Sequence, residues 1–197
     1  PTAEDYGSVT ASSVTDEDGI AEATYSAGAE AGYITIQATD MTCYNADDEH
    51  PVLDTYSVIV THIDHIEVDD AYQIGDTDAW AAGVTDDEEF VTITAVMKPS
   101  ISPEQAEGIV NWTGGAAVSS NPLQRTVSKQ TTGTTTVTAS TGWDDSHSVT
   151  INICEITSIS LVSGAVTIDD DNSVVGADPE ATDTVIVEAN LSPSISP

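Results

Sequence analysis

Closely spaced carboxylates are the side chains of this 197-residue sequence best suited to bind a ligand, and the ligand they suit is a hard cation. Asp76 and Asp78 lie in the segment DDAYQIGDTDAW, and Asp169 and Asp171 lie in TIDDDNSVVGADPE. Because Ca²⁺ prefers oxygen ligands of this kind, we predict these four residues as candidate Ca²⁺ ligands. The sequence has no complete DxDxDG loop, and among 34 acidic residues the same spacing also fits the solvated surface of a salt-adapted protein.

Histidines form a second candidate group. His62, His65, His147 and Asp144 are predicted to gather at one end of a folded unit in the middle of the chain, as a candidate transition-metal site. Solvent-exposed histidines are the alternative. The sequence contains no nucleophile elbow, zinc-type spacing, phosphate loop or haem attachment motif. Paired carboxylates occur along the whole sequence, so none of them is distinguished as a catalytic pair. We therefore predict that the protein is not an enzyme.

The charge balance excludes two classes of partner. The formal net charge is -31, and the basic residues are Lys98, Arg125 and Lys129. Nucleic-acid affinity depends largely on cationic side chains that displace counterions from phosphate, so nucleic acid is not expected as a partner. The same argument excludes anionic membrane surfaces.

Short runs of Val, Ile, Thr and Ala predict β-strands. VTITAV, SVTINI, TVIVEA, YITIQA and SVIV have the length and composition of strands, and turn residues separate such runs every 8 to 12 positions. No window repeats apolar residues at helical spacing over three turns. The elements that must position the candidate ligands are therefore strands of an all-β fold. The sequence does not begin with Met and opens on no leader-like segment, so we expect a mature product, an excised piece or a window of something longer.

The strands recur along the chain. EFVTITAVMKPSISP at 89–103 aligns with DTVIVEANLSPSISP at 183–197, an offset of 94 residues. VTHIDHIEV at 60–68 matches ICEITSISL at 153–161 in its apolar positions, at an offset of 93 residues. Recurrence at a nearly constant spacing indicates two copies of one structural unit.

These segments, with GIVNWTGG and TTGTTTVTASTG followed by SVTINI, resemble the bacterial immunoglobulin-like (Big) repeats of long surface proteins. The segment 7–39, GSVTASSVTDEDGIAEATYSAGAEAGYITIQAT, is similar to the second half of the repeats of invasin- and intimin-type adhesins. The resemblance implies tandem immunoglobulin-like β-sandwiches, with Trp112 as a core residue of the third strand.

The resemblance divides the chain into one complete module and two complementary halves. Residues 61–153 form the complete module, 1–60 the C-terminal half of a module, and 154–197 the N-terminal half. Placing Pro1 directly after Pro197 completes a module from the two halves. We therefore expect the partner to be further copies of the same repeat end to end, either as one period of a continuous chain or as subunits of a homopolymer.

Module geometry brings the two cysteines to one junction. In an immunoglobulin-like module the entering chain and the F–G loop lie at the same end. Cys43 falls in the F–G loop of the completed module, and Cys154 falls just before its first strand. We predict a disulfide between Cys154 of one copy and Cys43 of the next, with two unrelated buried thiols as the alternative. Such a bond implies an oxidising, extracellular location.

The same geometry assigns the acidic segments to junctions. Asp76 and Asp78 are predicted in the A–B loop, which faces the F–G loop of the following module, where residues 47–49 are acidic. Carboxylates that face carboxylates need a cation or high salt, which favours the Ca²⁺ prediction.

The predicted function is structural. We expect a repeat segment of an extracellular or cell-surface fibre, stalk or adhesin shaft, assembled end to end. The alternative is an adhesin module that binds a receptor or glycan, for which Trp80 and Trp143 are the candidate exposed aromatic residues.

Overall fold

Strands make up most of the described chain, which confirms the all-β prediction. The computed structural model describes residues 3–10, 14–39, 52–85, 88–142, 145–163, 166–169, 172–174 and 186–194. The N-terminal elements are η1 (Ala3–Tyr6), β1 (Gly7–Val9), β2 (Tyr25–Ala27), β3 (Gly32–Thr39) and β4 (Val52–Val60). The central elements are β5 (His62–Asp69), β6 (Tyr72–Ile74), β7 (Asp78–Ala82), β8 (Phe90–Lys98), α1 (Pro103–Ala106), β9 (Asn111–Thr113), β10 (Ala116–Ala117), β11 (Gln124–Ser128), β12 (Gly133–Ser140) and β13 (Ser146–Ser163). The C-terminal elements are β14 (Val166–Asp169), β15 (Asn172–Val174) and β16 (Ile186–Ser192).

One apolar core lies between two sheets in the central part of the chain. The first sheet has the strand order β10-β11-β8-β5, and the second has β6-β7-β13-β12-β9. Strand β8 shows how the sequence builds the core, because Val91, Ile93, Ala95 and Met97 alternate with more exposed residues and are buried. The core residues come from both sheets: Ile63, Ile66, Ala79, Ala81, Val91, Ile93, Ala95, Met97, Val110, Val127, Val137, Ala139, Val149, Ile151 and Ile153.

The PSISP motif ends strand β8 and starts a single helical turn. The Ser102 hydroxyl accepts a hydrogen bond from the Gln105 N–H at 3.3 Å, and the Gln105 side chain accepts one from the Ser102 N–H at 2.9 Å. This capping box, with Pro103 at the first helical position, fixes the start of α1. The bonds Lys98-Pro99 and Ser192-Pro193, one in each PSISP copy, are both cis. In the described ranges no helix is long and apolar enough to cross a membrane.

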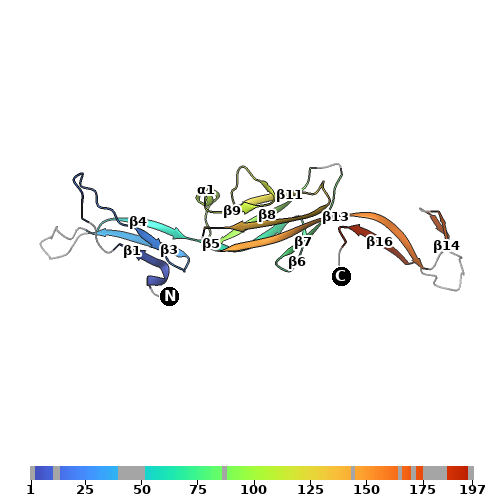
Figure 1. Cartoon of the computed structure of the whole chain (residues 1–197), viewed down its shortest axis with the longest axis horizontal. Coiled ribbons are helices and arrows are strands. Elements are labelled where there is room, and N and C mark those ends of the chain that lie inside the picture. Colours follow the sequence, from blue (N-terminus) through green and yellow to red (C-terminus); the bar gives the residue numbers. More distant parts are fainter. Residues whose placement is uncertain are drawn as a thin grey trace.

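Strands run through both boundaries of the central part. Strand β13 is 18 residues long, and it pairs with β12 and β7 along its first part and with β16 along its second part. On the other side, only Thr61 separates β4 from β5. Figure 1 shows the resulting elongated molecule, in which β13 leaves the central part and continues to β16, while β1 to β4 lie on the opposite side.

The pairs β5–β8 and β13–β16 share one register. In the first, His62 pairs with Lys98, and the register shifts between Ile63 and His65. In the second, Glu155 pairs with Ser192, and the register shifts between Ile156 and Ser158. These positions correspond at the offsets of 93 and 94 residues found in the sequence. The sequence recurrence is therefore also a recurrence of backbone pairing, bulge included.

The two pairs differ in burial. Ile63 and Ile66 of β5 are 1% and 8% exposed, whereas Ile156 and Ile159 at the corresponding positions of β13 are 61% and 65% exposed. All buried apolar residues of the described chain lie between Val60 and Ile153. Among the described residues, the core therefore belongs to the central part.

This difference predicts unequal effects of one substitution at corresponding positions. Ile63→Ala should lower the free energy of unfolding by about 2–5 kcal/mol, because it leaves a cavity in the core. Ile156→Ala should change it by less than about 0.5 kcal/mol, because the side chain is largely in water. Urea unfolding at low protein concentration measures both values, and equal losses would contradict the burial described here.

Candidate functional site

The candidate functional site consists of two strand pairs that, among the described residues, lie outside the central core. The C-terminal pair is β13–β16, in which Ile156, Ile159 and Val187 are each more than half exposed. In the part of the chain that the structure describes, β16 pairs only with β13, and its other edge carries no strand. The corresponding edge of β8 is paired with β11.

The N-terminal pair is the β3–β4 hairpin, whose ladder runs from Gly32 opposite Val60 to Thr39 opposite Val52. Ile34 and Ile36 alternate with exposed residues of β3, so the hairpin has one apolar face. This alternation is that of β12, where Val137 and Ala139 point into the central core.

Beside this hairpin, β1 and β2 form a two-stranded ladder in which Gly7 pairs with Ala27 and Val9 with Tyr25. The Tyr25 hydroxyl donates to the Tyr6 carbonyl oxygen at 2.5 Å. Gly7 has φ of 123°, and a Cβ there would collide with the Ser26 carbonyl oxygen, so this position requires glycine. The described chain places no strand along the other edge of β2.

Asp145 ties the loop before β13 to the start of β5, at the junction with the N-terminal pair. Its Oδ2 accepts a hydrogen bond from the Ile63 N–H at 2.8 Å, and its Oδ1 accepts from the Thr141 N–H at 3.1 Å and from the Thr141 hydroxyl. Next to it, the Thr61 hydroxyl donates to the Pro99 carbonyl oxygen at 2.8 Å. Burial opposes ionisation of Asp145, but these hydrogen bonds outweigh it and lower the pKa of the carboxyl below its usual value.

A lowered pKa in the folded state makes Asp145 a source of acid sensitivity. The carboxylate contributes stability above the usual Asp pKa of 3.8, and this contribution is lost as pH falls through the lower folded-state pKa. Asp145→Asn should lower the free energy of unfolding near neutral pH by about 1–3 kcal/mol, since an amide cannot accept all three hydrogen bonds.

Urea unfolding between pH 2 and 7 tests this prediction. The loss of stability on acidification should be shallower for Asp145→Asn than for the unsubstituted protein. Glu104→Gln, on an exposed side chain of α1, is the matched control. An unchanged pH profile in Asp145→Asn would show that the carboxylate is not the acid-sensitive group.

The opposite junction lies where β7 and β13 leave the core. The Gly83 N–H donates to the Cys154 carbonyl oxygen at 2.7 Å, and the Val84 N–H donates to the Lys129 carbonyl oxygen at 3.0 Å. The Cys154 thiol lies 3.5 Å from the Ala81 carbonyl oxygen and is partly buried. Cys43 lies outside the described residues, so the disulfide stays a prediction.

A groove on the central part holds several of the predicted ligands. His65, His147 and Asp76 line it together with Asp64 and Glu67. His65 and His147 thus line one groove, whereas His62 is not among its lining residues. Within the described ranges, no group of three or more His, Cys, Asp or Glu side chains is arranged to hold a metal ion. Asp144 and Asp171 lie outside those ranges.

The position expected for Asp76 and Asp78 was wrong. Strand β7 pairs in parallel with β13, with Asp78 opposite Thr150, so the β6–β7 turn lies beside the start of β13. Asp76 therefore lines the groove together with His147, near the start of β13. The opposite junction, where β13 leaves the core, is reached by Gly83. The sequence did not reveal this hairpin, because YQIG and DTDAW read equally well as one loop.

His65 lies between two carboxylates of this groove. Its Nδ1 lies 2.9 Å from Asp64 Oδ2 and its Nε2 lies 3.4 Å from Glu67 Oε1. The hydrogen bond with Asp64, then that with Glu67, raises the pKa of His65 above its usual 6.5. The same contact lowers the pKa of Asp64.

Substitution of the two carboxylates should rank their effects. Asp64→Asn should lower the pKa of His65 more than Glu67→Gln does, because the Asp64 contact is shorter and is the larger cause. An NMR titration of the His65 ring protons measures both. The reverse order, or no change in either variant, would contradict the pairing.

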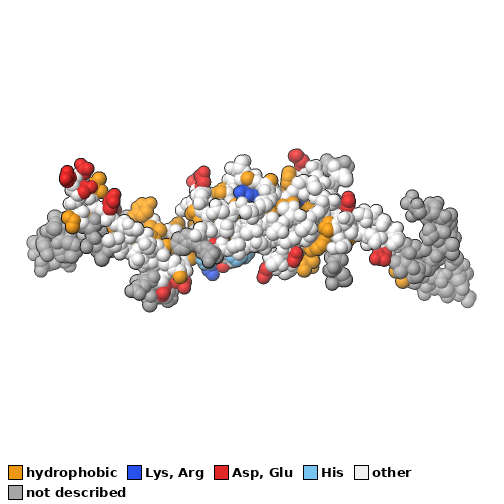
Figure 2. All heavy atoms as spheres, in the orientation of Figure 1, with side chains coloured by type: hydrophobic (Ala, Val, Ile, Leu, Met, Phe, Trp, Pro, Cys, Tyr) orange, Lys and Arg blue, Asp and Glu red, His pale blue; other side chains and the backbone are white. Residues whose placement is uncertain are grey.

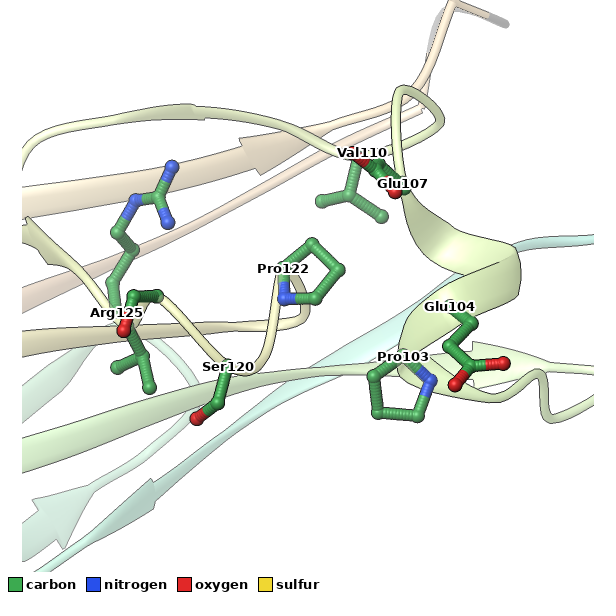
Figure 3. Close-up of a pocket in the computed structure, with 9 residues that line it drawn as sticks. Pro103, Glu104, Glu107, Val110, Ser120, Pro122 and Arg125 are labelled. Atoms are coloured by element: carbon green, nitrogen blue, oxygen red, sulfur yellow. The ribbon is translucent and has the colours of Figure 1, made fainter.

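A shallow pocket of about 370 Å³ lies between α1 and β11. Figure 3 shows Glu104 and Glu107 on the helical side and Arg125 across from them. The Arg125 guanidinium lies 5.5 Å from the Trp112 ring centroid, and the Trp112 Nε1–H donates to the Pro122 carbonyl oxygen at 2.8 Å. Because Trp112 is also half-buried against the core, its predicted packing role is confirmed. The Arg125 contact was not predicted, since nothing in the local sequence links residues 112 and 125.

The remaining aromatic candidates offer no patch among the described residues. Trp80 is half-buried in β7, opposite Asn152 and Tyr72. Trp143 lies outside the described residues. Comparisons with protein-family models, curated proteins and solved structures give no match to this chain.

Proposed function

We propose that the chain is a structural repeat segment of an extracellular fibre, stalk or adhesin shaft, built end to end from immunoglobulin-like sandwich modules. In this proposal 61–153 is one complete module, and 1–60 and 154–197 are halves of another. The observation that carries it is the shared register of β5–β8 and β13–β16, because one pairing pattern, bulge included, occurs twice along one chain. The two facing sheets of the central part support the sandwich assignment.

The junctions support a shaft. An 18-residue strand spans about 60 Å at about 3.3 Å per residue, so β13 extends well past the central core. A backbone that stays paired on both sides of a boundary resists bending there more than a free linker does. Acidic side chains are distributed along the length of the molecule in Figure 2, and their repulsion keeps neighbouring shafts apart at low salt.

Antibodies against the central part should label the native assembly along its length if this function is correct. Electron microscopy of the labelled surface structure measures the distribution. Labelling confined to the tip would favour the alternative, an adhesin module that binds a receptor or glycan. Denaturing electrophoresis of the same material then separates a continuous chain, which keeps a high mass, from a homopolymer, which gives one band at the mass of a single subunit.

A further inference from the structure

Outside the central core, several strands of the described chain have one paired edge and one edge without a strand, and β2 and β16 are two of them. Strand β2 pairs only with β1, and β16 pairs only with β13. Figure 1 shows β16 and the N-terminal strands on opposite sides of the central part. A strand edge presents a row of backbone N–H and C=O groups that can template another strand.

The central part contains the pairing that both edges lack. Strand β16 corresponds to β8 at the offset of 94 residues, and β8 pairs antiparallel with β11. Strands β11 and β2 correspond in their position along the sequence. Thr126-Val127-Ser128 precedes β12, Thr24-Tyr25-Ser26 precedes β3, and both following strands begin with glycine. The molecule thus shows, between β8 and β11, the contact that the start of β16 would make with residues 22–24, the segment that leads into β2.

We propose that the first residues of β16, 186–188, in one copy of this chain pair antiparallel with residues 22–24, which lead directly into β2, in a second copy, in the register of β8 and β11. Thr92 lies opposite Thr126 in the central sheet, so Ile186 lies opposite Thr24 of the second copy. The second copy's β3–β4 hairpin then covers the apolar face of Ile156, Ile159 and Val187, as β12 and β13 cover β5 and β8. The pairing rests on the proposed function, to which it adds the edge, the direction and the register.

Covering this face removes from water three apolar side chains that are each more than half exposed. The continuity of β13 also favours a second copy as the partner of β16. The part of β13 that pairs with β16 repeats the register of β5, and it continues directly from the part of β13 that lies in the central core. Within one copy, β2 lies on the opposite side of the central part from β16 (Figure 1), so the contact that repeats β8–β11 joins two copies.

The proposed register also places like charges together. Gln124 pairs with Thr94 in the central sheet, and the corresponding residues are Glu22 and Glu188. Directly opposed carboxylates weaken a strand pair and are screened by salt. The association should therefore strengthen with ionic strength, and Glu188→Thr should strengthen it at low salt.

Disulfide trapping tests the register. In the full chain with Cys43→Ser and Cys154→Ser, Thr24→Cys and Ile186→Cys should crosslink separate molecules under mild oxidation, because antiparallel partners lie within disulfide reach. The matched control replaces Thr24→Cys by Ser8→Cys, which lies one strand further from the edge. A ladder of linked species for Thr24→Cys and at least fivefold less for Ser8→Cys is the expected result. Equal crosslinking in the two variants, or none in either, overturns the proposal.

A circular permutant tests the coverage. Joining Pro197 to Pro1 and opening the chain before Thr61 makes the two half-modules, 154–197 and 1–60, contiguous in one molecule. Hydrogen exchange of the amides of 186–191 should then slow at least tenfold relative to the unpermuted chain at low concentration, and the permutant should stay monomeric. Unchanged exchange at these amides, with the amides of β8 still protected, overturns the proposal.

The two proposals fail separately. Labelling along a fibre without Thr24→Cys crosslinks leaves the structural function intact and rejects this junction. Crosslinks with labelling only at a tip support the junction and reject the shaft.

Discussion

The backbone ladder of β13 is the constraint on which the rest of the structure depends. Its first part is held between β12 and β7, and its second part holds β16. Because one uninterrupted strand belongs to both pairings, the direction of β16 is set by the central core and not by a linker. The covered and the uncovered parts of the molecule are therefore two lengths of the same strand.

Patterns of β-branched residues made much of this fold predictable. The runs around Val91 and Val149 alternate as strands with one buried face must. The recurrence of 60–68 and 89–103 predicted a second copy of one structural unit, and β13 and β16 repeat the pairing of β5 and β8. The β6–β7 hairpin could not be predicted, because its turn, Gly75-Asp76-Thr77, fits a longer loop equally well. Asp144 was predicted as a site residue in place of the adjacent Asp145. The sequence does not show which of the two neighbouring carboxylates accepts the hydrogen bond from the Ile63 N–H, because the backbone conformation determines it.

The three Lys and Arg residues of this acidic chain all contact side chains of the central part. Lys129 lies 3.3 Å from Glu89, and its side chain is only 13% exposed. Arg125 lies over the Trp112 ring, and Lys98 reaches Asp64 at 4.0 Å. Each cation is placed on the central part, where the core requires neighbouring segments to approach. The outer strands carry negative charge alone, so their contacts depend on apolar faces and on screening.

The parallel pairing of β7 with β13 has a consequence for load. Tension that enters through β5 pulls β7 toward the N-terminal junction, while tension that leaves through β13 pulls that strand the other way. The rungs from Asp78–Thr150 to Ala82–Cys154 lie side by side across this opposition. They are sheared together and cannot be peeled one at a time, so rupture of the central part under force demands the loss of several hydrogen bonds in a single event.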